Sequence, residues 1–270
     1  MLNKPALLNG WMIYAGLTTD ILWLSLSLLL LSALARMEWI GVPGWLLFAL
    51  YWTSQIGHYI GIDDYFNSIL AMGAALFCIT MAWMVLKRGF ATSSCLWASY
   101  AAAICGILYF PFAEIEVLNS WLIGETAILT ANFLALLNIP VAMVSWNTLA
   151  INDRSVEIVL ACTAIESIAL FAGIILSVAA PKSRRIFAVA LSTSAIYILN
   201  IARNAFVLLA YGEQWFGEES FYLAHNVIAK IGSTLALLII AYAVFSILPE
   251  LLKLIDDFTR EIRQPGRGMA

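Results

Sequence analysis

The sequence predicts an all-α polytopic membrane protein with about seven to eight transmembrane helices. Of its 270 residues, 63% are hydrophobic and only 11% are charged, and the mean hydropathy is +0.90. A soluble domain of this size would lack the charged side chains needed to cover its surface, whereas a surface that faces lipid needs few of them. The net charge of -3 leaves no strongly basic surface, so we expect no nucleic-acid partner.

Seven long apolar runs predict the transmembrane helices, because a helix needs about 20 mostly apolar residues to cross a bilayer. They cover residues 21–35, 42–60, 66–86, 93–110, 162–180, 186–211 and 225–248. An eighth apolar segment, 121–137, is ambiguous, since its length suits either a crossing or a helix that lies along the membrane.

Basic residues in short loops predict the orientation of these helices, because they favour the cytoplasmic side. The basic positions Arg36, 87–88, 182–185 and 253–263 alternate with acidic loops if seven runs cross. An eighth crossing would move 182–185 to the outside. We therefore expect segment 121–137 to form a small interfacial helix on the outer face, and the C-terminal tail to lie in the cytoplasm.

The stretch that follows this segment predicts a short β-hairpin. It contains two β-branched runs, 139–144 and 156–159, and the turn-like pair Asn152-Asp153. An open hairpin cannot face lipid, so it should lie at the outer interface. An irregular interfacial loop is the alternative interpretation.

The expected organisation has four regions. They are a four-span N-terminal region (1–110), the outer-face helix and hairpin (111–160), a three-span region with the candidate catalytic residues (161–248) and a cytoplasmic tail (249–270). The tail after Asp257 is polar and is predicted to be a frayed end.

Polar groups gather in the last three predicted spans, where a lipid-facing helix should avoid them. They are Cys162, Thr163, Glu166 and Ser167 at the head of one span, Asn200, Arg203 and Asn204 in the next, and His225, Asn226 and Lys230 at the head of the last. If 162–180 is one helix, Cys162 and Glu166 share a face. Arg203 lies about 12 Å from the outer end of its span at roughly 1.5 Å per residue, so we expect the three groups to meet in the outer half of the membrane.

A thiol, a guanidinium and an imidazole in one place suit acyl transfer through a thioester. The thiolate of Cys162 would be the nucleophile, and it needs a nearby cation or base because a free thiol titrates at about pH 8.5. His225 would take and return the proton, and Arg203 would hold the thiolate or stabilise an oxyanion. A bare carboxylate at Glu166 would disfavour the thiolate, so we expect it to pair with Arg203 or Lys230.

Each of these residues also has a structural interpretation. Cys162 could be a small apolar residue in a helix, Arg203 could form a structural ion pair with Glu166, and His225 could be an interfacial histidine. The four cysteines of the chain show no spacing suited to a metal, so we expect neither a metal nor a cofactor.

Taken in order, the three groups resemble the motifs of the exosortase/archaeosortase family of membrane transpeptidases. That family has a Cys followed by Ser or Thr and Gly-Ile, then Asn-x-x-Arg on the next span, then a His. The matching positions here are Cys162-Thr163-Ala164-Ile165, Asn200-Ile201-Ala202-Arg203-Asn204 and His225-Asn226. The resemblance covers residues 121–248, with departures at Ala164 and Glu166.

The resemblance implies a cysteine protease and transpeptidase of the cell membrane whose site faces the extracytoplasmic side. Its partners would be secreted proteins with a C-terminal tripartite signal, namely a Pro-Gly-Phe-type motif, a membrane helix and a basic end. The enzyme would form a thioester on Cys162 and pass the new C-terminus to a membrane lipid acceptor. Details of the motifs suggest an archaeal source.

Two other classes of function fit the composition. A polytopic transporter could use Arg203, Glu166 and His225 as a substrate or proton site, although the sequence shows no inverted repeat or matched interrupted helices. A scaffold subunit of a membrane complex would tolerate conservative changes at all three motif positions. A transporter would keep its activity in a Cys162→Ser variant, whereas a thiol enzyme would lose it.

Overall fold

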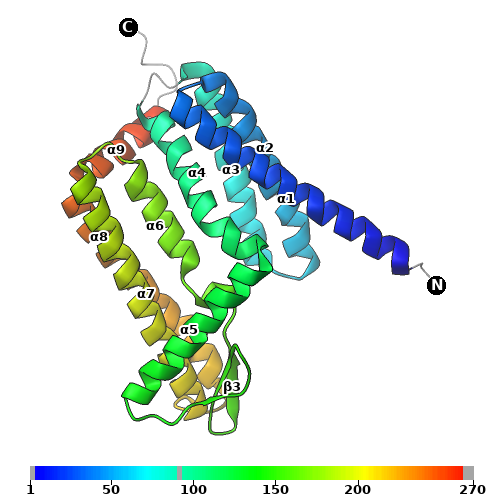
Figure 1. Cartoon of the computed structure of the whole chain (residues 1–270), viewed down its shortest axis with the longest axis vertical. Coiled ribbons are helices and arrows are strands. Elements are labelled where there is room, and N and C mark those ends of the chain that lie inside the picture. Colours follow the sequence, from blue (N-terminus) through cyan, green and yellow to red (C-terminus); the bar gives the residue numbers. More distant parts are fainter. Residues whose placement is uncertain (1–3, 90–92, 264–270) are drawn as a thin grey trace. The chain divides into compact units, whose positions relative to one another are not determined.

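The computed structural model describes residues 4–89 and 93–263, and its elements are shown in Figure 1. The chain divides into two compact units. One contains the chain up to Gly106 together with the chain from Lys253 onward, and the other is Ile107–Leu252. The regions expected at 111–160 and 161–248 both lie within the second unit.

The first unit consists of long apolar helices, which confirms that the four N-terminal apolar runs are helical. They are α1 (Lys4–Ala35), α2 (Glu38–Gly61), α3 (Tyr65–Arg88) and the start of α4 (Ser93–Glu114). Leu26, Trp45 and Met81 are fully buried in its core. The indole Nε1 of Trp45 donates a buried hydrogen bond of 3.0 Å to Ser99 Oγ, so the polar atom of this large side chain is satisfied.

The C-terminal tail is helical beyond the point where we expected fraying. Helix α9 (Pro249–Arg263) continues past Asp257. The Phe258 ring contacts Phe77 and Trp97 at centroid distances of 6.3 and 6.4 Å. The prediction of a frayed end after Asp257 is therefore wrong up to Arg263, because one face of this polar segment is apolar and packs; residues 264–270 lie outside the described part.

The second unit is organised around helix α7. Its elements are α5 (Glu116–Leu136), β1 (Ala142–Met143), β2 (Thr148–Ile151), β3 (Arg154–Glu157), the 3₁₀ turn η1 (Leu160–Cys162), α6 (Ile165–Ser177), α7 (Lys182–Gly212), the 3₁₀ turn η2 (Gly217–Glu219), the π-helix η3 (Tyr222–Ile228) and α8 (Ala229–Ile247). Helix α7 packs against α5, α6, α8 and the strands β2 and β3, and Figure 1 shows α5 and β3 at the same end of this unit. Every group of the candidate site lies on an element that touches α7 or follows one that does.

A hairpin is present within a three-stranded antiparallel sheet in the order β1-β2-β3, but its strands are β2 and β3. The expected pairing of the runs 139–144 and 156–159 is wrong, because β2 lies between β1 and β3. Ile151 pairs with Arg154, so Asn152-Asp153 forms the turn as expected. The middle strand β2 was not predicted, because Leu149 and Ala150 in its centre are not β-branched and give no β-branched run. Its inward residues Leu149 and Ile151 are buried in a core cluster with residues of α5 and α7.

Five helices in the described part of the chain are long and apolar enough to cross a membrane. They are Leu17–Ala35, Tyr65–Lys87, Ser94–Glu114, Lys182–Gly212 and Tyr222–Ile247. The predicted number of seven to eight is therefore not confirmed. Helix α2 is not apolar enough to be among the five, and α6 has only 13 residues, about 20 Å at 1.5 Å per residue, where the hydrocarbon core is about 30 Å thick.

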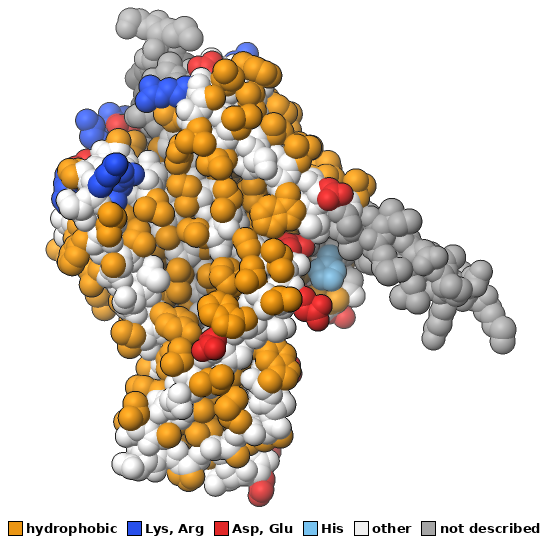
Figure 2. All heavy atoms as spheres, viewed as in Figure 1, with side chains coloured by type: hydrophobic (Ala, Val, Ile, Leu, Met, Phe, Trp, Pro, Cys, Tyr) orange, Lys and Arg blue, Asp and Glu red, His pale blue; other side chains and the backbone are white. Residues whose placement is uncertain are grey.

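The surface agrees with a membrane protein. Hydrophobic side chains cover much of the face shown in Figure 2, and large apolar residues such as Phe66, Ile239 and Tyr242 are at least 70% exposed. In water this surface would be costly, whereas in a bilayer it is the solvated surface. Helix α5, which we expected to lie on the outer face, is not among the five candidate spans.

Candidate active site

Cys162 lies in a tight turn before α6 and not on the helix. It is the last residue of η1, and its N–H donates to Val159 O at 2.8 Å. The next residue, Thr163, is buried, and its hydroxyl donates to Leu160 O at 2.7 Å. The expected helical face shared by Cys162 and Glu166 is therefore wrong, because α6 begins only at Ile165.

The chain reverses direction between the thiol and the helix at Ala164. This residue has φ 61° and ψ 12°, in the left-handed region, and it occupies the N-cap position of α6. A residue with a Cβ pays a steric cost of about 1 kcal/mol or more for this conformation, and glycine does not. The glycine in the family pattern at this position therefore has a backbone reason, and this chain accepts the strain beside its candidate nucleophile.

Two asparagines of α7 hold the main chain of Cys162 in place. Asn200 Nδ2 and Asn204 Nδ2 donate to Cys162 O at 2.7 and 2.8 Å. Both asparagines are buried, and they lie one helical turn apart, so they reach the same carbonyl oxygen. The Cys162 side chain is half-buried against the core cluster that includes Leu149. The Cys motif and the Asn-x-x-Arg-Asn motif thus meet at the carbonyl oxygen of Cys162.

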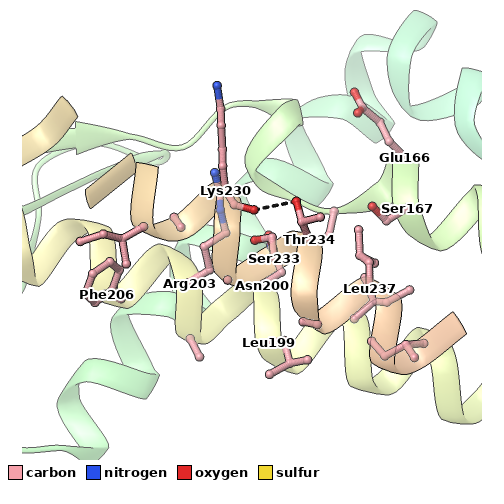
Figure 3. Close-up of a pocket in the computed structure, with 18 of the residues that line it drawn as sticks. Glu166, Ser167, Leu199, Asn200, Arg203, Phe206, Lys230, Ser233, Thr234 and Leu237 are labelled. Carbon is pink, nitrogen blue, oxygen red and sulfur yellow. Dashed lines mark hydrogen bonds between the residues drawn. The ribbon is translucent and has the colours of Figure 1, made fainter. Parts of the chain in front are cut away.

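Arg203 lies between these asparagines and faces a cavity of about 630 Å³. The cavity walls come from η1 and α6, from α7 and from α8. Its polar lining is Glu166, Ser167, Asn200, Arg203, Lys230, Ser233 and Thr234. Figure 3 shows these side chains around the cavity, with apolar residues such as Leu199 and Leu237 also lining it.

Cys162 and His225 are not among the described residues that line this cavity. Ala161 and Ala164, on either side of the Cys162-Thr163 pair, do line it, so the thiol lies beside one wall. The structure therefore brings Arg203, Asn200, Glu166 and Lys230 together around one space and places Cys162 next to it.

Glu166 does not form the ion pair that we expected. Within the described part of the chain, no ion pair joins it to Arg203 or Lys230. In Figure 3 Glu166 extends from α6 on one side of the cavity and Lys230 from α8 on the other. Helix α6 begins at Ile165, so Glu166 lies in its first turn, where the helix dipole favours a carboxylate.

The guanidinium of Arg203 has no carboxylate partner among the described residues. Its NH1 makes one long hydrogen bond of 3.4 Å to Asn204 Oδ1. A half-buried arginine in a membrane helix is costly unless it has a task, and here most of its donors remain available to a ligand. This is the electrostatic feature that an oxyanion would use.

His225 lies in the middle of the π-helix η3, at the head of α8. Short π-helical stretches occur frequently at functional sites. The imidazole is half-buried, stacks on Phe221, and lies within electrostatic range of Arg203 and Lys230. Asn226 is half-buried in the same turn.

Two polar residues of the cavity lining, Ser233 and Thr234, were not predicted from the sequence. They lie three and four residues after Lys230, so the helical repeat places them on its face of α8, and that spacing was the available signal. In the described part of the chain, no cluster of three His, Cys, Asp or Glu side chains could hold a metal ion. The arrangement is that of a thiol with a fixed main chain beside a cationic cavity, which suits acyl transfer.

Comparison with known proteins identifies the family of this chain. The model of the transmembrane exosortase family matches residues 7–246. Archaeosortase A of Natronomonas pharaonis is 29% identical over 244 positions, which cover 79% of this chain and 76% of that protein. Archaeosortase A of Haloferax volcanii is 28% identical over 287 aligned positions, which cover 90% and 93%. No solved structure gives a significant match. The chain therefore belongs to the exosortase/archaeosortase family of multi-pass membrane proteins.

Proposed function

We propose that this protein is a membrane cysteine transpeptidase that cleaves the C-terminal sorting signal of secreted proteins through a thioester on Cys162. The observation that carries the proposal is the pair of hydrogen bonds from Asn200 and Asn204 to Cys162 O. They join the Cys motif to the Asn-x-x-Arg-Asn motif and leave Arg203 beside the thiol's turn with free donors. These hydrogen bonds hold the main chain that carries the thiol, next to an arginine that has no carboxylate partner among the described residues.

The first half-reaction forms the thioester. His225 accepts the thiol proton, and the thiolate of Cys162 attacks the carbonyl carbon of the scissile peptide bond. Arg203 stabilises the negative charge on the carbonyl oxygen of the tetrahedral intermediate. The C–N bond then breaks, His225 gives its proton to the leaving nitrogen, and the new C-terminus remains bound to sulfur.

The second half-reaction transfers that C-terminus to an acceptor. An amine or hydroxyl of a membrane lipid attacks the thioester carbon and loses its proton to His225. The C–S bond breaks, and the proton returns to the sulfur of Cys162. The apolar and cationic lining of the cavity supports a reaction with membrane-embedded molecules, because both a signal helix and a lipid bring apolar surface.

The test is the co-expression of a tagged substrate that carries a Pro-Gly-Phe-type C-terminal signal. We expect wild type and Cys105→Ala to process and lipidate it, and Cys162→Ala to leave it unprocessed. Cys105 is the matched control because it is also a free, half-buried cysteine. Full processing by Cys162→Ala, at equal amounts of enzyme in the membrane, would overturn the proposal.

A further inference from the structure

The turn between β2 and β3 is fixed to the end of α7. Asn152 Nδ2 donates to Gly212 O at 3.1 Å and to Glu213 Oε1 at 3.2 Å. Gly212 allows this approach, because a Cβ there would lie 2.6 Å from Ile151 Cβ, closer than side-chain atoms pack. The sheet is thus held against the C-terminal end of α7, which comes before η3 in the chain.

A continuous series of ring contacts leads from this sheet to His225. The Arg154 guanidinium of β3 lies over the Tyr211 ring, 5.0 Å from its centroid. The Tyr211 ring meets Phe221 edge to face at 5.4 Å and 68°. Phe221 in turn stacks parallel to the imidazole of His225, at 5.2 Å and 6°. We call these four residues the Arg154–His225 stack.

The face of the His225 imidazole is covered by the Phe221 ring. In the part of the chain that the structure describes, neither ring nitrogen of His225 forms a hydrogen bond to a protein group. In many catalytic sites a carboxylate holds the histidine that acts as base. A base must nevertheless be held within about 10–20° of its productive orientation. For His225 the parallel face of Phe221 supplies that restraint.

We propose that Phe221 is a positioning residue for His225, supported from behind by Tyr211 and Arg154. The inference rests on the proposed role of His225 as the proton carrier. Phe221 is not among the described residues that line the cavity; it acts by limiting rotation of the imidazole. Through the same contacts the small sheet supports the geometry of the site, which gives the sheet a task in the enzyme beyond covering α7.

The experiment compares Phe221→Leu, which removes the ring, with Phe221→Tyr, which keeps it. Phe216→Leu is the matched control, because Phe216 lies in the same connection and is 39% exposed like Phe221, whereas the ring that stacks on His225 is that of Phe221. Purified enzyme in lipid nanodiscs would process a synthetic membrane peptide with the sorting motif, and kcat, KM and the pH–rate profile would be measured.

We expect Phe221→Leu to lower kcat by about 10-fold with little change in KM, and to displace the pH–rate profile. Phe221→Tyr should restore wild-type values, and Arg154→Gln should lower kcat by about 3-fold because it acts through two further rings. If Phe221→Leu does not accumulate, Tyr211→Leu, which removes the edge contact behind the stack, answers the same question with a smaller expected decrease.

The inference fails if Phe221→Leu behaves like Phe216→Leu, or if Phe221→Tyr is as slow as Phe221→Leu. Parallel Cys162→Ala and His225→Ala variants separate this failure from failure of the proposed function. If both are inactive while Phe221→Leu is normal, only the positioning role is wrong. If Cys162→Ala retains turnover, the transpeptidase proposal itself is wrong.

Discussion

Arg184 near the start of helix α7 and Arg203 in its second half have opposite surroundings. Near the start, Arg184 forms an ion pair with Glu250 and also donates to Ile247 O at 3.3 Å. Toward the other end, Arg203 faces a cavity, with one long hydrogen bond to Asn204. The protein pairs the guanidinium of Arg184 with a carboxylate, whereas most donors of the Arg203 guanidinium have no protein partner among the described residues.

The difference shows how one helix can serve both stability and chemistry. Arg184 and the neighbouring Arg185, whose NH1 donates to Leu176 O at 2.8 Å, tie the start of α7 to the ends of α8 and α6. At the other end the protein satisfies the main chain of Cys162 instead and leaves the guanidinium of Arg203 with donors to spare. Fixed main chain and available charge together are what electrostatic preorganisation requires.

The sharpest test of this comparison replaces each arginine in turn. Arg203→Gln should lower the rate of substrate processing by about 10²- to 10³-fold, because it removes the charge expected at the oxyanion. Arg184→Gln should change that rate by less than about 3-fold. The measurement is processing of a tagged substrate by equal amounts of each variant, and equal losses at the two positions would contradict the division of roles.

The next largest effect on processing is expected when the two asparagines that donate to Cys162 O are replaced. Asn200→Leu and Asn204→Leu each remove one donor from Cys162 O, and the double variant leaves that carbonyl without either. An acceptor left unsatisfied costs about 1–3 kcal/mol, so the double variant should lose more stability than the two single variants added together. Processing should fall by about 10-fold as the turn that carries the thiol loosens.

Thermal unfolding and the rate of Cys162 alkylation by a maleimide would measure these changes. Ser192→Ala is the control, since Ser192 is also buried on α7 but its hydroxyl bonds only to Val189 O. Additive losses, or an unchanged alkylation rate in the double variant, would show that the asparagines do not hold the Cys162 turn.

The smallest effect should appear at the Arg184 end and should depend on pH. A hydrogen bond from its own backbone N–H, and then the hydrogen bond from Arg184, hold the pKa of Glu250 below its usual value. Its contribution to stability is therefore present above about pH 4.3, the ordinary glutamate pKa, and is lost as the pH falls through the lower folded value. Glu250→Gln should lower Tm slightly at pH 7, and the difference from wild type should vanish below that value.

Melting curves of wild type and Glu250→Gln between pH 3 and pH 7, in steps of about one unit, would test this. Glu218→Gln, at an exposed glutamate outside the ion pair, should leave Tm unchanged throughout. A Tm difference that persists or grows in acid would mean that Glu250 does not stabilise the fold as a carboxylate.

Most of the helices could be predicted from long apolar runs in the sequence, and the errors have local causes. Long runs such as those of α1, α3 and α7 predict helices, because a helix satisfies its backbone hydrogen bonds within one continuous apolar segment. The start of α6 was misplaced because a left-handed Ala164 gives no signal in composition. The continuation of α9 was missed because its apolar residues are few, although they are spaced to pack on one face.

The sequence by itself determined that this protein is a polytopic membrane protein. It singled out Arg203 because an arginine is expensive in an apolar helix and rarely remains there without a task. It singled out Cys162 and His225 because, in order with Arg203, they resemble the motifs of the family. Only the tertiary structure decided which protein groups contact these residues and hold them in place. Hydrogen bonds and ring stacking depend on positions to within an ångström, between residues such as Asn204 and Cys162 that are far apart along the chain. No local pattern encodes that geometry, because it arises when α7, the η1 turn and the sheet pack against one another.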